Sequence, residues 1–206
     1  ADITIFNPDT IAEACTYQNP HQYSPGIEHV IVNGVHTLEK GKFLGEFGGL
    51  VGLDGLVNFG RPSTARPVAL HGWVKYNCGA IDELGRVPSS RPNLQKGDMD
   101  EGQIMIAVGS WRAEEYGGSA ECPVVVNTKD ESTYFDINGK DVIGAGEMIL
   151  TESTDGWIEF TLPLDYRSTS DVPTHMIIVC TGSRFGDYFT GSTQSLMLVD
   201  DLTLVY

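Results

Sequence analysis

Short segments in which hydrophobic and polar residues alternate constrain the fold of this chain more than any other feature. In the segment RPVALHGWVKYN at 66–77, one face would carry Val68, Leu70, Val74 and Tyr76. This period of two is the pattern of a β-strand with one face on a core. Comparable segments are GQIMIAVGSW at 102–111, PVVVN at 123–127, STYFDI at 132–137 and GWIEFTLPL at 156–164.

Turn-forming clusters separate these segments. Asn33-Gly34, between the alternating halves of His29–Glu39, is the clearest, because both central residues of a type I′ turn need positive φ. Helix is expected only as a short element at Pro8–Cys15 and a turn at Trp111–Tyr116. With 24 glycines and 10 prolines in 206 residues, this spacing favours a sandwich over alternating strands and helices. We expect an all-β fold, a jelly-roll β-sandwich of two antiparallel sheets, in a single domain over residues 1–206.

The charge of the chain limits its partners. Twenty-eight acidic residues face 13 basic ones, for a formal net charge of -15, which repels phosphate backbones and anionic lipids. We therefore expect no nucleic acid partner, and instead a neutral ligand, a cation or simple solubility. No run of about 18 apolar residues is present, so we expect no membrane insertion by this segment.

The four cysteines, Cys15, Cys78, Cys122 and Cys180, lack C-x-x-C spacing, which argues against a zinc ribbon or a thioredoxin-type site. Three disulfide pairings could be drawn, but a chain of this length can fold without them, and we expect buried free thiols.

Motifs for catalysis are missing. The sequence has no G-x-S-x-G, H-E-x-x-H or G-x-x-x-x-G-K-[ST], and its five histidines are scattered. A glycosidase needs two carboxylates about 5 to 10 Å apart, and among 28 acidic residues such a pair arises by chance. We therefore expect no enzyme, and keep a glycoside-active enzyme as an alternative.

Sugar binding needs an aromatic face for the ring and polar side chains for the hydroxyls. Trp111 and Tyr116, beyond the end of an expected strand, and Trp73, on the polar face of its strand, are the candidates. Each could instead be a packing residue, and Trp157 is expected to anchor the core. The polar segment Asp82–Gly102 reads as one long loop, a candidate binding rim or mobile flap.

The last strand, LMLVDDLTLVY, carries Asp200 and Asp201 among apolar residues. By alternation, one face carries Leu196, Leu198, Leu202 and Leu204 and the other carries Met197, Val199 and Val205, so both faces look buried. A carboxylate there needs a hydrogen-bond partner or a cation such as Ca2+. The alternative is a β-bulge that turns one or both carboxylates to solvent.

Three segments in this order resemble the putative carbohydrate metabolism domain family: GRPSTARPVALHGWVKYN, DGWIEFTLPLDY and GSRFGDYFTGSTQSLMLVDDLTLVY. The resemblance covers roughly residues 42–206. It implies a jelly roll similar to carbohydrate-binding modules, found at the C-terminus of exported surface lipoproteins of glycan-degrading gut bacteria. It also implies a cell-surface or periplasmic location, and a structural calcium ion that would be held by Asp200 or Asp201.

The function expected from the sequence is non-catalytic binding of a polysaccharide or oligosaccharide, beside neighbouring domains or outer-membrane glycan-uptake proteins. A structural or adhesive module that contacts protein is the main alternative. A concave aromatic shelf near Trp111 and Tyr116 would favour the glycan, and a flat apolar patch would favour a protein partner. Two carboxylates in a cleft, one with a raised pKa, would favour the enzyme.

Overall fold

The computed structural model describes residues 3–6, 9–12, 25, 27–32, 35–39, 42–43 and 55–206. The chain divides into two compact units, Ala1–Gly52 and Leu53–Tyr206. The single domain over residues 1–206 that the sequence predicts stays a prediction.

The N-terminal unit contains one antiparallel sheet in the order β1-β2-β3-β4. Its strands are β1 (Ile3–Phe6), β2 (Ile27–Val32), β3 (Val35–Glu39) and β4 (Lys42–Phe43). The expected hairpin is confirmed, because β2 pairs antiparallel with β3 on either side of residues 33 and 34. Of the helix expected at Pro8–Cys15, residues 9–12 are described and form no helix, and the rest lies outside the described residues.

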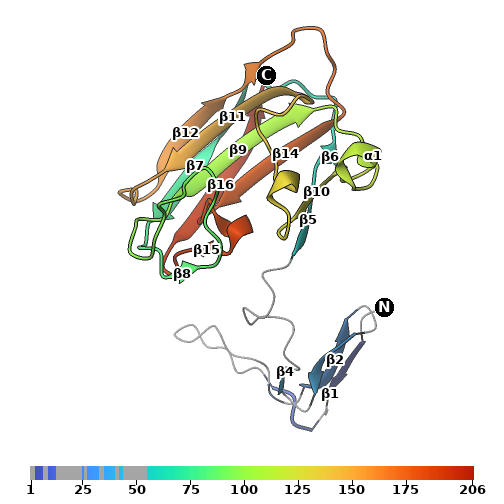
Figure 1. Cartoon of the computed structure of the whole chain (residues 1–206), viewed down its shortest axis with the longest axis vertical. Coiled ribbons are helices and arrows are strands. Elements are labelled where there is room, and N and C mark those ends of the chain that lie inside the picture. The colour runs from blue at the N-terminus through green and yellow to red at the C-terminus, as the bar shows by residue number, and fades with distance from the viewer. Residues whose placement is uncertain are drawn as a thin grey trace. The chain divides into compact units, whose positions relative to one another are not determined.

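The regular elements of the second unit are mostly strands (Figure 1). They are β5 (Leu56–Phe59), β6 (Arg61–Pro62), β7 (Ala69–Asn77), β8 (Glu83–Leu84), β9 (Gly102–Gly109), β10 (Val124–Asn127), β11 (Val142–Leu150), β12 (Ile158–Pro163), β13 (Asp165–Tyr166), β14 (His175–Thr181), β15 (Thr190–Gly191) and β16 (Leu196–Val205). Its helical turns are α1 (Ala113–Tyr116), η1 (Glu131–Thr133) and η2 (Gly186–Tyr188). None of the helices among the described residues is long or apolar enough to cross a bilayer.

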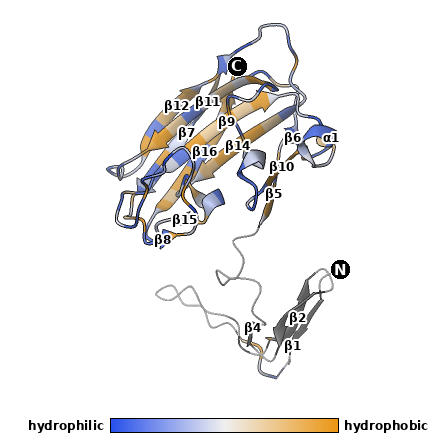
Figure 2. Cartoon of the chain, in the orientation of Figure 1, coloured by the Kyte–Doolittle hydropathy of each residue, from blue (hydrophilic) through white to orange (hydrophobic). Residues whose placement is uncertain are grey.

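A five-stranded sheet, β13-β11-β9-β14-β6, and a three-stranded sheet, β12-β7-β16, form the sandwich. All of their pairings are antiparallel, and the chain passes between the sheets repeatedly, which confirms the all-β class. The core between them is one cluster of buried side chains: Leu70, Val74, Ile104, Ile106, Val108, Phe160, Leu162 and Leu164. Hydrophobic residues accordingly concentrate on the strands, and hydrophilic ones on the loops (Figure 2).

The other face of the five-stranded sheet is covered as well. Met105 and Ala107 alternate with the core residues of β9 and pack in a second cluster with Trp111, Val124 and Ile177. The ribbon of β5 and β10 supplies part of this cover. Because both faces of β9 are buried, its sequence is a continuous apolar run from Ile104 to Val108.

One expectation in this region is wrong. The segment STYFDI at 132–137 is not a strand but the end of η1 and the turn after it, where the cap at Asp130 accepts a hydrogen bond from Ser132 N at 3.0 Å. The segment Asp82–Gly102 is largely a loop, as expected, and its Leu94 packs with Ile81 and Phe185 in a small core.

Strand β16 is an edge strand whose two faces are not both buried. The pairing with β7 shifts between Asp200 and Thr203, where β16 has one residue more than its partner, and Asp201 adopts φ 50. This confirms the bulge. The extra residue reverses the alternation, so Leu198 lies outward at 42% exposed, while Leu204 packs against the core.

Candidate functional site

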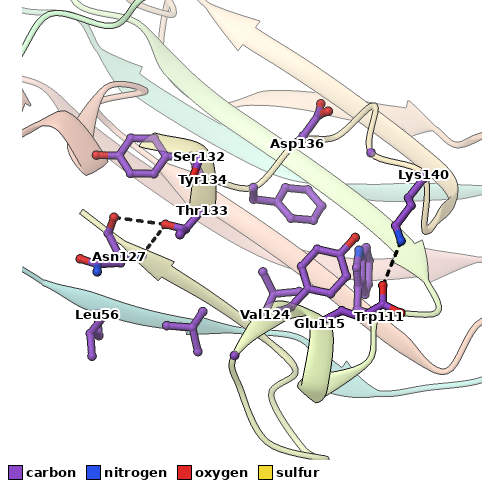
Figure 3. Close-up of a pocket in the computed structure, with 15 residues that line it drawn as sticks. Leu56, Trp111, Glu115, Val124, Asn127, Ser132, Thr133, Tyr134, Asp136 and Lys140 are labelled. Atoms are coloured by element: carbon purple, nitrogen blue, oxygen red, sulfur yellow. Dashed lines mark hydrogen bonds and ion pairs between the residues drawn. The ribbon is translucent and has the colours of Figure 1, made fainter. Parts of the chain in front are cut away.

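A concave pocket of about 680 Å3 lies on the covered side of the five-stranded sheet, among β5, β10, α1 and the segment 132–140 (Figure 3). Its aromatic and apolar lining is Leu56, Trp111, Tyr116, Val124, Val125, Tyr134 and Phe135. Its polar lining includes Glu115, Asn127, Ser132, Thr133, Asp136 and Lys140. We call this the first pocket.

Local turns position the two predicted aromatics of this pocket. Gly109 at the end of β9 lets the chain fold back closely, since a Cβ there would lie 2.7 Å from Cζ2 of Trp111. One turn of α1 follows and ends at Gly117, whose φ of 76 suits glycine. Trp111 and Tyr116 therefore line the same pocket.

The two aromatics differ in exposure. Trp111 is only 3% exposed and meets Phe135 edge to face at 5.7 Å, so it supports the pocket from beneath and offers no ring face to solvent. Tyr116 is half-buried, and its hydroxyl group donates a hydrogen bond to Asp141 Oδ2 at 2.6 Å. Burial, and then Asp141, raise the pKa of Tyr116 to about 12, so the phenol is neutral at pH 7.

The opposite wall is fixed by hydrogen bonds between β10 and η1. The backbone N–H of Asn127 donates to Thr133 Oγ1 at 2.8 Å, and the Thr133 hydroxyl lies 2.7 Å from the carbonyl oxygen of Asp130. At the rim, Lys140 Nζ lies 2.9 Å from Glu115 Oε2, and this contact holds the pKa of Glu115 below its usual value.

A second pocket, of about 560 Å3, adjoins the first, and Tyr134, Phe135 and Asp136 line both. Its further lining comes from β9, β11 and β14 and from the turn η2, and includes Gln103, Met105, Glu147, Val179 and Asp187. Pro88 and Ser90 also line it, so part of the segment 82–102 does form a rim, as the sequence predicts. Sequence reasoning missed Tyr134, Glu147 and Asp187, because no local pattern marks residues that only long-range packing brings together.

Two carboxyl groups of the second pocket have different surroundings. Glu147 accepts a hydrogen bond from Gln103 Nε2 at 2.6 Å and lies 3.7 Å from Arg184. Asp187 is half-buried, and within residues 55–206 no group makes a hydrogen bond with its carboxyl oxygens. Burial raises the pKa of Asp187.

Trp73 lies apart from these pockets, on the outward face of the three-stranded sheet. It is 37% exposed and pairs with Glu159 on one side and with Asp200 on the other. The structure therefore brings Trp73 together with Asp200, and not with Trp111 and Tyr116. Trp157, expected in the core, is 44% exposed because it precedes the first paired residue of β12, Ile158.

Asp200 and Asp201 are both exposed at the bulge, and Asp200 Oδ1 accepts a hydrogen bond from Asp201 N at 2.9 Å. Among the described residues no group of three or more His, Cys, Asp or Glu could hold a metal ion. Cys78, Cys122 and Cys180 are free thiols, each partly exposed rather than buried, and Cys15 lies outside the described residues.

Comparison with known proteins gives a match over most of the chain. Residues 31–205 match the family described as putative carbohydrate metabolism domain. No curated protein matches.

Solved structures are similar as well, and two of them show the extent of the likeness. One is named a putative glycoside hydrolase from Bacteroides thetaiotaomicron, with 21% identity, a TM-score of 0.53, and coverage of 73% of this chain and 41% of that one. Another, named a putative glycoside hydrolase from Bacteroides vulgatus, has 22% identity, a TM-score of 0.49, and coverage of 72% and 56%. The chain thus spans about two fifths of the first structure, and that likeness shows the fold alone.

Proposed function

Because this chain belongs to the putative carbohydrate metabolism domain family, we propose that it is a non-catalytic glycan-binding domain and that the first pocket is its binding site. The observation that carries this proposal is the pocket's composition. Tyr116, Tyr134 and Phe135 lie in one concave surface with Asn127, Ser132 and Asp136. Aromatic faces pack on the C–H groups of a sugar ring, and amide, hydroxyl and carboxylate groups bind its hydroxyls.

A glycan array covering plant, mucin and host glycans tests this proposal, followed by calorimetric titration of the best ligand. Tyr116→Ala should weaken binding at least about tenfold, since it removes a ring from the pocket. Trp73→Ala is the matched control, because Trp73 is an exposed aromatic outside both pockets and should leave the affinity unchanged. No binding to any glycan at millimolar concentration would refute the proposal.

Glycoside hydrolysis is a second candidate, and the second pocket is the observation that favours it. Asp187, with its raised pKa, could serve as general acid, and Glu147 as the other carboxylate. Assays for new reducing ends from the glycans that bind would test it, with Asp187→Asn as the inactive variant. Absence of product from every bound glycan would leave the non-catalytic role standing.

A protein-contact role is favoured by the outward face of the three-stranded sheet, where Trp73, Leu196 and Leu198 are exposed. If this face is adhesive, the Trp73→Ala control should abolish capture of a protein partner and spare glycan binding.

We further propose that the domain acts outside the cytoplasm, at the cell surface or in the periplasm, close to proteins that take up or degrade glycans. The net charge of -15 agrees with a neutral ligand. Fractionation of expressing cells, with protease treatment of intact cells, tests the location. A signal confined to the cytoplasm would contradict it.

A further inference from the structure

The two pockets share a wall of three consecutive residues, Tyr134, Phe135 and Asp136. Figure 3 shows Tyr134 and Asp136 on the segment that borders the first pocket. We propose that the pockets are adjacent subsites for one linear, neutral oligosaccharide, whose successive sugar rings lie on either side of residues 134–136. This inference rests on the proposed function and specifies its ligand.

The second pocket has the groups that a sugar unit needs. Met105 and Val179 give it an apolar floor, and the polar side chains of Gln103, Glu147 and Asp187 line it. One N–H of the Gln103 amide donates a hydrogen bond to Glu147. The second N–H and the carbonyl oxygen of this amide can then bond to a ligand. Hydroxyl groups that both donate and accept hydrogen bonds are the natural complement of this set.

Asp187 gives the clearest sign that a ligand completes the second pocket. The carboxyl group of Asp187 is half-buried, and its oxygens accept no hydrogen bond from residues 55–206, so they can accept one from a ligand in the pocket. A sugar hydroxyl in the pocket would supply the missing partner.

The wall between the pockets is held rigidly by contacts from distant segments. Tyr134 Oη lies 2.8 Å from the carbonyl oxygen of Asp187, and its ring meets that of Tyr188 edge to face at 4.8 Å. Tyr188 Oη donates to Glu131 Oε1 at 2.7 Å, and Ser89 Oγ donates to the same oxygen at 2.6 Å. A wall ordered before binding lowers the entropy cost of holding a long ligand.

The charges favour a neutral chain. The cations that line the pockets, Lys140 and Arg184, already contact Glu115 and Glu101 at 2.9 Å. Asp136 and Asp187 add further carboxyl groups to the lining, so a sulfated or uronic acid chain would meet net repulsion.

Chain-length dependence of affinity tests the inference on the full chain. The probes are cello-, xylo-, manno- and chito-oligosaccharides of two and of six units. For at least one series, the six-unit ligand should bind at least about tenfold more tightly than the two-unit ligand. Asp187→Ala should remove this gain and leave the affinity of the short ligand unchanged, whereas Asp155→Ala, an exposed carboxylate outside both pockets, should change neither.

A second variant keeps the inference testable if Asp187→Ala does not fold. Ser90 is an exposed residue of the second pocket but not of the first, so Ser90→Tyr should block the second pocket without touching a core. It should abolish the increase in affinity from the two-unit to the six-unit ligand, as Asp187→Ala does. Equal affinities for short and long ligands, with no effect of either variant, would overturn the inference and spare the proposed function. Binding of charged or branched glycans alone would overturn it too, and binding of no glycan would overturn both.

Discussion

Trp111 and Tyr116 lie five positions apart in one short segment and have different roles. The tryptophan supports the pocket from within a hydrophobic cluster, and the tyrosine lies on the pocket surface with its hydroxyl group bonded to Asp141. The sequence predicts that both belong to one site, because both follow the same strand. It does not predict which is buried, because that depends on Phe135, which reaches Trp111 from a distant turn.

Tyr116→Phe separates the contribution of the hydroxyl group from that of the ring, because the variant removes the first and keeps the second. Loss of the hydrogen bond to Asp141 should lower the free energy of unfolding by about 1 kcal/mol. The ring remains, so the glycan affinity should change far less than in Tyr116→Ala. Denaturant unfolding and titration measure the two effects, and equal loss of binding in both variants would contradict a stacking role.

Glu101 makes the stability depend on pH. Its burial would raise the pKa of the carboxyl group, but hydrogen bonds from Arg184 and Arg91 outweigh burial and the pKa is lowered. A lowered pKa stabilises the folded state at pH values above the ordinary glutamate pKa of about 4.3. This stabilisation is lost as the pH falls through the folded-state pKa. Glu101→Gln should therefore be less stable than the wild type at pH 7, and the difference should shrink in acid. A difference independent of pH would contradict this role.

At the scale of elements, strands were predictable wherever alternation is unbroken. Leu70 and Val74 of β7, and Phe160 of β12, are buried as their positions predict. The prediction for β16 failed before Asp200, where Leu196 and Leu198 are exposed, and after it, where one extra residue that the leucine pattern does not mark reverses the faces of the strand. The strand predicted at STYFDI is wrong because the β-branched and aromatic residues there lie in a turn, where Thr133 accepts a backbone hydrogen bond.

The bulge in β16 depends on the backbone of Asp201, whose φ is 50. Asp201→Gly should leave the stability nearly unchanged, since glycine adopts this conformation freely. Asp201→Val should cost about 1 to 3 kcal/mol, because a β-branched residue is strained there. Urea unfolding of both variants checks the contrast, and equal stability would show that the bulge is not retained in solution.

A calcium ion at Asp200 and Asp201 stays a prediction. These two exposed carboxylates would need backbone carbonyls and water as further ligands. If an ion binds the folded state only, calcium should raise the melting temperature and a chelator should lower it, and Asp200→Ala should abolish both effects. Identical melting curves with calcium and with chelator would remove the site.

At the scale of the whole molecule, the sandwich could be predicted from the sequence. The ribbon of β5 and β10 that covers the outer face of the five-stranded sheet could not. The β5 and β10 ribbon pairs Leu56 with Asn127, residues far apart in sequence, and no local pattern reports such a pairing. Yet this ribbon and the turn after it form the walls of the first pocket. The family and the fold were thus accessible from the sequence, while the second pocket and its carboxyl groups needed the structure.

The three tryptophans of the chain allow a direct test of glycan binding in the first pocket. Each indole N–H gives its own NMR signal, and only Trp111 lines that pocket, whereas Trp73 and Trp157 are exposed outside both pockets. During titration with a glycan found on the array, the Trp111 indole signal should shift in a saturable way and the other two should stay in place. Shifts of the Trp73 or Trp157 signals with Trp111 unchanged would contradict glycan binding in this pocket.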